Sequence, residues 1–235
     1  PESARPVRVS SLHERLAGQG ACFGELCGWE RANWFAPKGV EPMDIWSYRT
    51  FNSMPHVGAE CLSVRNKVGL FEMSPMAKYE VSGSAAEAWL NSILANRMPK
   101  TKGRTVLAHF LTDKGTVRAE FTVTRLDENL FYLIGTPRGE RHDSDILEKA
   151  LPLDGSVKLC NVTLERGGFT VVGPNSRKVL ENLVEADLSN EDFPWMTAQS
   201  VTVGLASDVR MMRVSYEGEL GWELYHPITY NLHLF

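Results

Sequence analysis

The sequence has no apolar run long enough to cross a membrane as a helix, and residues 1–20 lack the apolar core of a signal peptide. Its basic residues are scattered rather than gathered into runs, and the formal net charge is −4. This charge pattern argues against nucleic acid as the main partner. The composition, 43% hydrophobic and 23% charged, is typical of a soluble globular protein. We therefore expect no membrane partner and a cytoplasmic location, or the mitochondrial matrix if the source is eukaryotic.

Cysteine is scarce, and so are motifs for cofactors. The four cysteines form no C-x-x-C pair, and Cys22 and Cys27 have no close histidine partner. We expect reduced thiols and no metal site. No G-x-G-x-x-G follows an expected strand, and no serine or cysteine nucleophile motif is present. The sequence therefore predicts no flavin-binding machinery in this chain.

Two stretches that lie 90 residues apart share the order strand, glycine, helix. The first has an expected strand at 79–81 and a helix at 84–93, and the second has a strand at 169–173 and a helix at 175–184. Each is followed by segments that predict antiparallel hairpins. A length of 235 residues is enough for one large domain or two small ones. The repeat indicates a duplicated α+β unit, in which each half is a sheet with helices on one face.

Capping-box patterns, serine followed three residues later by glutamate, predict where two helices begin. They occur at Ser11-x-x-Glu14 and Ser84-x-x-Glu87. A helix over 56–68 is expected to turn one apolar stripe inward, formed by Val57, Cys61, Val64 and Val68. The other expected elements are strands at 105–111, 116–126, 130–134 and 157–164 and a polar helix at 137–151.

Residues 209–227 predict a β-hairpin with a tight turn, in which Gly218 and Gly221 supply positive φ values. Strand side chains alternate, so Glu223 points away from its apolar neighbours. A carboxylate there, beside Tyr216, is suited to hold a planar ligand with two parallel N–H donors. An ordinary hairpin with exposed acids also explains the stretch.

Residues 27–37 combine three aromatic side chains with interleaved charged residues. The segment either packs on the core as a lid, through Trp29 and Trp34, or walls a pocket for a flat ligand. We assign residues 1–55 to an N-terminal lead-in segment and residues 56–235 to the main domain. Because the last residues read as the opening of a helix, we expect the main domain to be truncated at its C-terminal end.

Two motifs carry a family resemblance. Gly28-Trp-Glu-Arg-Ala-Asn-Trp-Phe35 resembles the segment that follows the flavin module in dimethylglycine and sarcosine dehydrogenases. Ser215-Tyr-Glu-Gly-Glu-Leu-Gly-Trp-Glu-Leu-Tyr225 resembles the signature of the folate-binding glycine-cleavage T-protein (aminomethyltransferase) family. Further counterparts of that family fall at Arg65, Gly69-Leu70-Phe71, Ser74, Asn96, Leu111, Gly115 and Val171-x-Gly173-Pro174. The similarity covers nearly the whole chain, and the dehydrogenase branch is the nearer match.

The resemblance implies a fold of two intertwined ferredoxin-like halves with antiparallel sheets that binds tetrahydrofolate as a co-substrate. It implies FAD only in a separate flavin module, upstream in the same chain or on a partner chain. That module would oxidise a methylated amine, and folate would capture the resulting iminium or formaldehyde as 5,10-methylenetetrahydrofolate. The implied partners are therefore folate, a one-carbon unit from a methylated amine, and a flavin-binding module.

The resemblance also implies roles for four residues. Glu223 would hold the pterin edge, and Tyr216 and Met76 would line the same pocket. Glu120 would be the catalytic carboxylate, at the position where T-proteins carry an aspartate close to the reacting folate nitrogens. A carboxylate there can take up a proton and stabilise positive charge in the transition state. From the strand pattern alone, Glu120 is an ordinary exposed acid.

Three positions depart from the T-protein pattern. Glu120 is longer than aspartate by one methylene, Leu107 stands where T-proteins have a pocket tyrosine, and Gly135 stands where they have an asparagine. Three functions stay open: the folate-binding domain of an amine-demethylating flavoenzyme, a free-standing aminomethyltransferase or folate-dependent demethylase, and a non-catalytic module that docks or stabilises a flavoprotein. The missing tyrosine argues against a true T-protein.

Two weaker features remain. Residues 138–143 could bind an anion such as the glutamyl tail of folate, but a solvated helix start is the favoured interpretation. His56, His109 and His226 lie far apart in sequence and show no metal-ligand spacing, so we expect structural roles for them.

Overall fold

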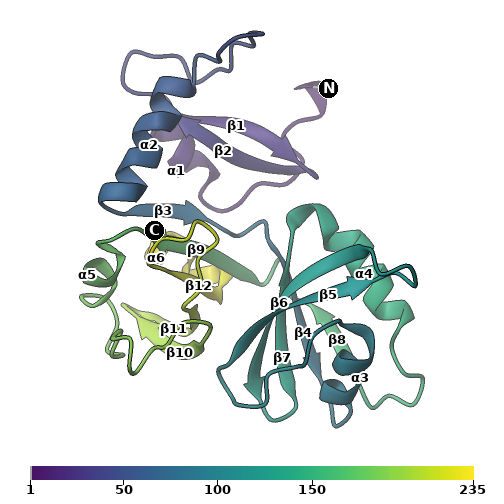
Figure 1. Cartoon of the computed structure of the whole chain (residues 1–235). Helices are drawn as coiled ribbons and strands as arrows, with labels where there is room; N and C mark the ends of the chain where they lie inside the picture. The colour runs from purple at the N-terminus through teal and green to yellow at the C-terminus, as the bar shows by residue number, and fades with distance from the viewer. Residues whose placement is uncertain (1) are drawn as a thin grey trace.

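The computed structural model describes residues 2–235 and contains two five-stranded sheets and one two-stranded sheet, all antiparallel (Figure 1). The strands are β1 Ala21–Leu26, β2 Trp29–Phe35, β3 Gly69–Glu72, β4 Ala77–Ser82, β5 Thr105–Leu111, β6 Val117–Asp127, β7 Leu130–Gly135, β8 Lys158–Asn161, β9 Arg166–Val172, β10 Ala198–Val203, β11 Ala206–Met212 and β12 Gly221–Pro227. The helices are α1 His13–Gly18, α2 Met54–Asn66, α3 Ala86–Ile93, α4 Glu140–Lys149, α5 Ser176–Leu180 and α6 Asn231–Leu234, with single 3-10 turns at Glu2–Ala4, Pro137–Gly139 and Ile228–Tyr230. No helix within residues 2–235 is long and apolar enough to cross a membrane.

The two large sheets have the same plan. One has the strand order β5-β6-β7-β4-β8 and the other has the order β10-β11-β12-β9-β3. The short strands β3 and β8 are exchanged: β3 precedes β4 in the chain but pairs with β9, and β8 precedes β9 but pairs with β4. Each half therefore completes its sheet with a strand from the other half, which confirms the prediction of a duplicated, intertwined α+β fold.

The repeated glycines hold this exchange in place. Gly83 and Gly173 both have φ of +124°, a conformation that side chains other than glycine rarely adopt. A Cβ on Gly83 would lie 2.2 Å from the carbonyl oxygen of Ser156, and a Cβ on Gly173 would lie 2.6 Å from that of Val64. Ser156 lies two residues before β8, and Val64 lies in the last turn of α2, the helix that precedes β3. In both halves the turn after the strand that pairs with the exchanged strand, β4 or β9, thus packs on residues that precede the exchanged strand.

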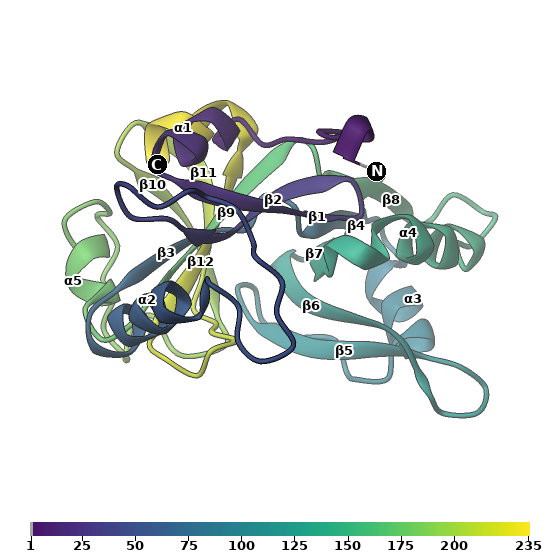
Figure 2. The ribbon, with the colours of Figure 1, turned by 90° about the horizontal axis from the view of Figure 1, so that it is seen from above.

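One apolar cluster packs each large sheet on its helices, and a third apolar cluster joins the two sheets; Figure 2 shows the arrangement of the sheets and helices. In β6, Phe121 and Val123 are buried against α3, whereas Thr122 and Thr124 point the other way because strand side chains alternate. Where the two sheets meet, Tyr132 and Tyr225 pack edge to face with ring centroids 5.8 Å apart. The inter-sheet face therefore combines apolar packing with the polar side chains of residues such as Thr122.

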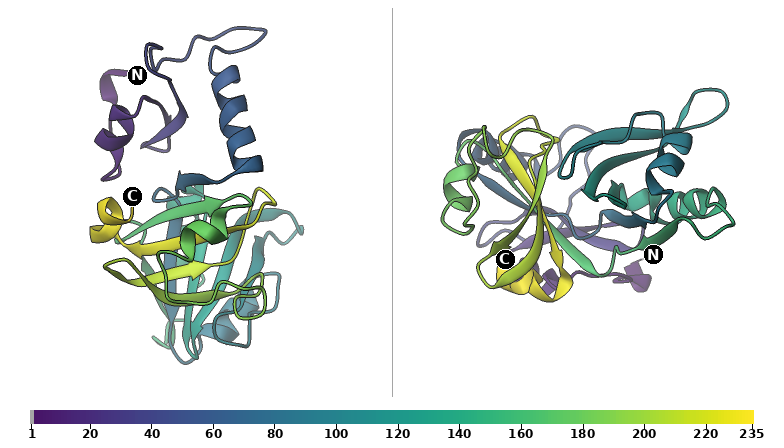
Figure 3. Two further views of the ribbon diagram at one scale, coloured as in Figure 1. Left: turned by 90° about the vertical axis from the view of Figure 1, so that its left-hand side faces the viewer. Right: turned by 90° about the horizontal axis from the view of Figure 1, so that it is seen from below.

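The N-terminal residues form the β1–β2 hairpin, which is set apart from the two large sheets (Figure 3). Trp34 is 1% exposed, and its indole N–H donates to Asp44 at 2.8 Å. Leu12, Leu16 and Ala21 pack on Phe169 of β9. The aromatic segment thus belongs to a hairpin that covers part of the second-half sheet.

Several local predictions were wrong. Ser11 and Ser84 do not cap α1 and α3, because each helix begins one residue later and its N-cap position is held by Leu12 or Ala85. The Ser11 hydroxyl instead accepts a hydrogen bond from Asn231 at 2.9 Å.

Two helix predictions also need correction. Helix α2 buries no residue completely, and Cys61 is exposed, because the helix lies at the edge of the molecule with only part of its surface covered (Figure 1). Helix α5 ends at Leu180, earlier than the predicted end at residue 184.

The hairpin at 209–227 is confirmed as β11 and β12, but its connection is a loop over 213–220 rather than a tight turn. Gly218 has φ of +80°, whereas Gly221 has no positive φ and begins β12. Trp222 is fully buried on one face of β12, and Glu223 points to the other face as predicted.

Candidate functional site

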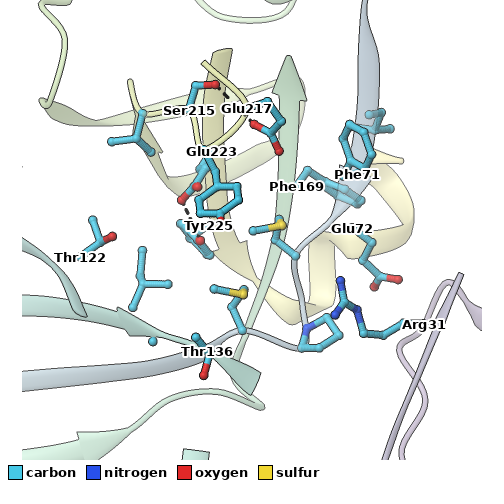
Figure 4. Close-up of a pocket in the computed structure, with 18 of the residues that line it drawn as sticks. Arg31, Phe71, Glu72, Thr122, Thr136, Phe169, Ser215, Glu217, Glu223 and Tyr225 are labelled. Atoms are coloured by element: carbon cyan, nitrogen blue, oxygen red, sulfur yellow. Dashed lines mark hydrogen bonds between the residues drawn. The ribbon is translucent and has the colours of Figure 1, made fainter. Parts of the chain in front are cut away.

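A cavity of about 690 Å³ is lined by residues of both large sheets and of the β1–β2 hairpin. Directly opposed residues of an antiparallel pair share a face, and successive residues alternate. Glu223 lies opposite Thr170, whereas Glu72 lies opposite Phe169, so the two glutamates line the cavity from opposite faces of the second-half sheet. Figure 4 shows Glu223 on one side of β9 and Glu72 on the other.

The cavity therefore has two lobes. We call the first the inter-sheet lobe, and it is lined by Met76, Leu107, Glu120, Thr122, Ile134, Gly135, Glu223 and Tyr225. We call the second the hairpin lobe, and it is lined by Arg31, Ala32, Phe35, Glu72, Phe169 and Phe235.

Glu223 is the central polar group of the inter-sheet lobe. Burial, together with the charge of nearby Glu217, raises the pKa of its carboxyl to about 7. The Tyr225 hydroxyl donates a hydrogen bond to the carboxylate at 2.9 Å and partly offsets this rise (Figure 4). A raised pKa means that, without a ligand, the ionised carboxylate is less stable in this site than in water. A ligand that donates N–H groups to this carboxylate would favour the ionised form and offset that loss of stability.

Tyr225 was missed by sequence reasoning. It is fully buried, and it lies opposite Gly168 on β9. A Cβ on Gly168 would lie 3.0 Å from the Tyr225 ring, so the glycine makes the space that the ring occupies. The glycine pair at 167–168 was the available signal, but its meaning depends on knowing which strand faces it.

Glu120 lies at the edge of the inter-sheet lobe, on β6, with half of its side chain exposed. Its carboxylate is 2.8 Å from Nε2 of His109, the directly opposed residue on β5. His109 was expected to be structural, yet it makes a direct contact with the predicted catalytic carboxylate. The pairing of β5 with β6 brings these two residues together.

Tyr216 and Met76 also line the cavity, from two different connections. Tyr216 is 98% exposed on the loop at 213–220, so it lies at the mouth. Met76 lies between β3 and β4, and its carbonyl oxygen accepts a hydrogen bond from Nζ of Lys78 at 2.6 Å. Lys78 is fully buried, and burial lowers the pKa of its ammonium to about 7.

All four predicted site residues, Met76, Glu120, Tyr216 and Glu223, thus line one cavity. Their roles toward a ligand stay predictions. Leu107 and Gly135, the positions that depart from the T-protein pattern, line the same lobe. A Cβ on Gly135 would lie 3.2 Å from the Phe121 ring, so a side chain there requires Phe121 to move.

The other histidines make structural contacts. His56 stacks on Trp34 with ring centroids 5.3 Å apart, and Nε2 of His226 is 3.0 Å from Oδ1 of Asn231. Residues 2–235 contain no cluster of three or more His, Cys, Asp or Glu side chains that could hold a metal ion.

Comparison with known proteins is consistent with this geometry. The model of the GCVT N-terminal domain family matches residues 12–235. Mitochondrial dimethylglycine dehydrogenase of Homo sapiens is 37% identical over 226 residues, which cover 95% of this chain and 26% of that protein. Mitochondrial sarcosine dehydrogenase of Homo sapiens is 31% identical over 268 residues, which cover 97% of this chain and 29% of that protein. The chain spans about a quarter of the length of these curated relatives.

A solved structure shares the fold. The crystal structure of the glycine cleavage system aminomethyltransferase T from Bartonella henselae superposes with a TM-score of 0.79 at 23% sequence identity, covering 97% of this chain and 56% of that one. Fold and family match together define an aminomethyltransferase-like domain. The chain belongs to the GCVT N-terminal domain family, the folate-binding glycine-cleavage T-protein family, and is related to dimethylglycine and sarcosine dehydrogenases. The predictions of family and fold class are confirmed.

Proposed function

We propose that this chain is the tetrahydrofolate-binding, one-carbon-accepting domain of an amine-demethylating flavoenzyme similar to dimethylglycine and sarcosine dehydrogenases. Tetrahydrofolate is the co-substrate and binds in the inter-sheet lobe. FAD belongs to a separate flavin-binding module of the same or a partner chain, so the 235-residue chain is expected to be colourless when purified. The proposed location is the cytoplasm, or the mitochondrial matrix in a eukaryote.

The observation that carries this proposal is Glu223. The pterin ring of folate is planar and presents adjacent N–H donors along one edge, and a carboxylate accepts such donors in pairs. Glu223 offers that carboxylate in a lobe that is otherwise largely apolar, and Tyr225 holds its orientation from behind. The apolar walls, including Met76 and Ile134, suit the faces of a flat ring.

Glu120 supports the chemical part of the proposal. When a folate nitrogen attacks an electrophilic carbon, that nitrogen becomes positively charged and then loses a proton. A carboxylate at the edge of the lobe stabilises the charge as it develops and accepts the proton. Glu120 is exposed enough to remain accessible to such a nitrogen, and its contact with His109 limits its freedom.

The proposal is tested by titrating the chain with tetrahydrofolate in a calorimeter. Glu223→Gln keeps the shape and an acceptor for Tyr225 but removes the charge. The variant is expected to bind about tenfold to a hundredfold more weakly, the usual effect of losing a charge-assisted hydrogen bond. Equal tetrahydrofolate affinity of the wild type and the variant would contradict the proposed pterin site.

The same titration separates the alternatives. A chain that binds no folate at all would be a docking or stabilising module. A chain that binds folate but occurs in an open reading frame without a flavin-binding half would be a free-standing aminomethyltransferase or folate-dependent demethylase. A flavin-binding half in that reading frame supports the proposed function.

A further inference from the structure

The hairpin lobe is a second part of the cavity next to the inter-sheet lobe, and the folate site proposed above does not include it. Its walls come from four distant parts of the chain: β2 of the hairpin, the end of β3, the middle of β9 and the residue that follows α6. Three of its lining side chains are aromatic, namely Phe35, Phe169 and Phe235. Phe169 and Phe235 stack with ring centroids 6.3 Å apart.

Glu72 is the unexplained group in this lobe. Its Oε1 atom is buried and has no hydrogen-bond partner, and Glu72 forms no ion pair among the described residues. A buried carboxylate oxygen without a partner is costly, and native proteins rarely leave one. The arrangement therefore favours a donor that binds here.

Nearby charges do not satisfy Glu72. The carboxylate interacts electrostatically with the ammonium of Lys78, but the hydrogen bonds of that ammonium go to the carbonyl oxygens of Ser74 and Met76. Glu30, an acid on β2 that also lines the cavity, is already neutralised by Arg5 in a pair at 2.5 Å. Glu72 is thus the free negative charge of the hairpin lobe.

Arg31 supplies a positive charge at the same end of the cavity. Its side chain is exposed and makes no ion pair within residues 2–235. Figure 4 shows Arg31 and Glu72 on the side of β9 away from Glu223. One free acid and one free guanidinium beside aromatic rings suit a small ligand that carries both charges.

We propose that the hairpin lobe binds a zwitterionic N-methylated amino acid, or the iminium derived from it, with the cationic nitrogen against Glu72 and the carboxylate on Arg31. Aromatic faces attract alkylated ammonium groups, and guanidinium binds carboxylates through paired N–H donors. The glutamyl tail of folate fits less well because it carries two negative charges and no cation to match Glu72. The inference rests on the proposed function, which places the one-carbon acceptor in the adjoining lobe.

The experiment titrates the 235-residue chain with N,N-dimethylglycine and follows it by ligand-observed NMR and calorimetry. Dimethylamine and acetate serve as probes that carry only the cation or only the anion. Saturable binding of dimethylglycine, tighter than that of either single-charge probe, is expected. Absence of saturable binding overturns the inference.

Matched variants locate the site. Glu72→Gln and Arg31→Gln are each expected to weaken dimethylglycine binding about tenfold, and Glu217→Gln, which changes another cavity acid, is expected to have no such effect. Arg31 is exposed, so its variant tests the site even if Glu72→Gln fails to fold. Equal binding by wild type and the Arg31 variant contradicts the proposal.

Folate titrations of the same proteins keep this inference separate from the proposed function. Glu72→Gln is expected to bind tetrahydrofolate normally, whereas Glu223→Gln is expected to bind dimethylglycine normally but folate poorly. If Glu223→Gln leaves folate binding intact, the proposed function fails whatever the hairpin lobe binds. If dimethylglycine binding depends on Glu223 rather than Glu72, the ligand occupies the inter-sheet lobe and the inference fails.

Discussion

The two halves of the molecule have the same topology, but they carry different residues at equivalent positions of the two sheets. Counting back from Gly83 and Gly173, Lys78 in the first half corresponds to Gly168 in the second. Glu80 and Thr170 are equivalent by the same count. Tyr132 pairs with Glu80 and Glu223 pairs with Thr170, so Tyr132 in the first half corresponds to Glu223 in the second. The first half fills its inter-sheet face with a buried lysine and a tyrosine ring. The second half replaces them with a glycine and a carboxylate, and the cavity forms beside that carboxylate.

The comparison teaches that duplication supplied the scaffold and that a few substitutions at aligned positions supplied the site. The second half contributes Glu223 and Tyr225, which we propose bind folate, and the first half contributes Glu120, which we propose assists the reaction. Binding and chemistry would then be divided between the halves. Each prediction below tests part of this division.

The largest expected effect is on the first half. Glu120→Gln should slow one-carbon capture by ~10²–10⁴-fold or somewhat less while leaving folate affinity nearly unchanged, because positive charge on the folate nitrogen develops only in the transition state. The measurement requires the intact flavoenzyme, with methylenetetrahydrofolate and free formaldehyde both quantified per amine oxidised. An unchanged ratio of the two products would show that Glu120 is only a strand acid.

The next effect tests the glycine that distinguishes the second half. Gly168→Ala places a methyl group 3.0 Å from the buried Tyr225 ring and 3.3 Å from Met73. Overpacking of this kind costs roughly 1–3 kcal/mol, and folate binding should fall as Tyr225 moves. Thermal unfolding measures the loss. The control is Gly58→Ala in α2, where nothing lies within 4 Å of the added atom; equal stability of the two variants would contradict the alignment argument.

A smaller effect comes from the proton on Glu223. Its pKa is raised to about 7, so below that pH the free site is increasingly neutral and folate must compete with a proton. Folate affinity should therefore be nearly constant above pH 8, fall as the pH drops below 7, and level off about tenfold to a hundredfold lower, near the affinity of Glu223→Gln. Glu223→Gln has no such proton and should give a flatter profile. Parallel profiles for the two proteins would assign the pH dependence to another group.

The same pKa predicts the sign of a stability change. A carboxyl whose pKa is raised in the folded state is most destabilising when ionised, which is the case above pH 7. The penalty disappears as the pH falls from about 7 toward the ordinary carboxyl pKa. Glu223→Gln should thus unfold at a higher temperature than wild type at pH 8, and the difference should shrink toward pH 5.

The smallest expected effect is on folate affinity, and it distinguishes the buried Tyr225 from the buried Tyr132. Tyr225→Phe removes the hydrogen bond to Glu223 and should weaken folate binding a few-fold, in line with ~0.5–1.5 kcal/mol for one hydrogen bond. Tyr132→Phe in the first half is the matched control, because the Tyr132 hydroxyl is buried and has no partner. Calorimetry with folate measures both variants. A larger loss with Tyr132→Phe than with Tyr225→Phe would reverse the assignment.

Features that depend on residues close together in the sequence could be predicted from the sequence. The orientation of Glu223 follows from strand alternation, and the 90-residue repeat indicated the duplicated sheets. The helix starts failed because a shift of one residue moves the serine out of the capping position. Such a shift depends on how the preceding turn packs, which the local pattern does not record.

The hairpin lobe could not be predicted. It brings Arg31, Glu72 and Phe169 together only because β3 leaves its own half to pair with β9 and because the hairpin folds over that strand. The contact of His109 with Glu120 likewise depends on the register of β5 against β6. Pairings between distant segments have no signature within either segment, so the sequence shows each residue without its neighbours.

The exchange of β3 and β8 has a consequence for how the chain is made. A ribosome releases β3 long before β9, and β4 long before β8, so two strand edges wait unpaired while the intervening residues are synthesised. Unpaired edges invite pairing with other chains, and contacts between distant residues form slowly. The first-half sheet therefore lacks its edge strand until β8 has been synthesised, and β3 has no partner until β9 follows. Slow translation between residues 83 and 158 would prolong the period in which a nascent chain depends on chaperones.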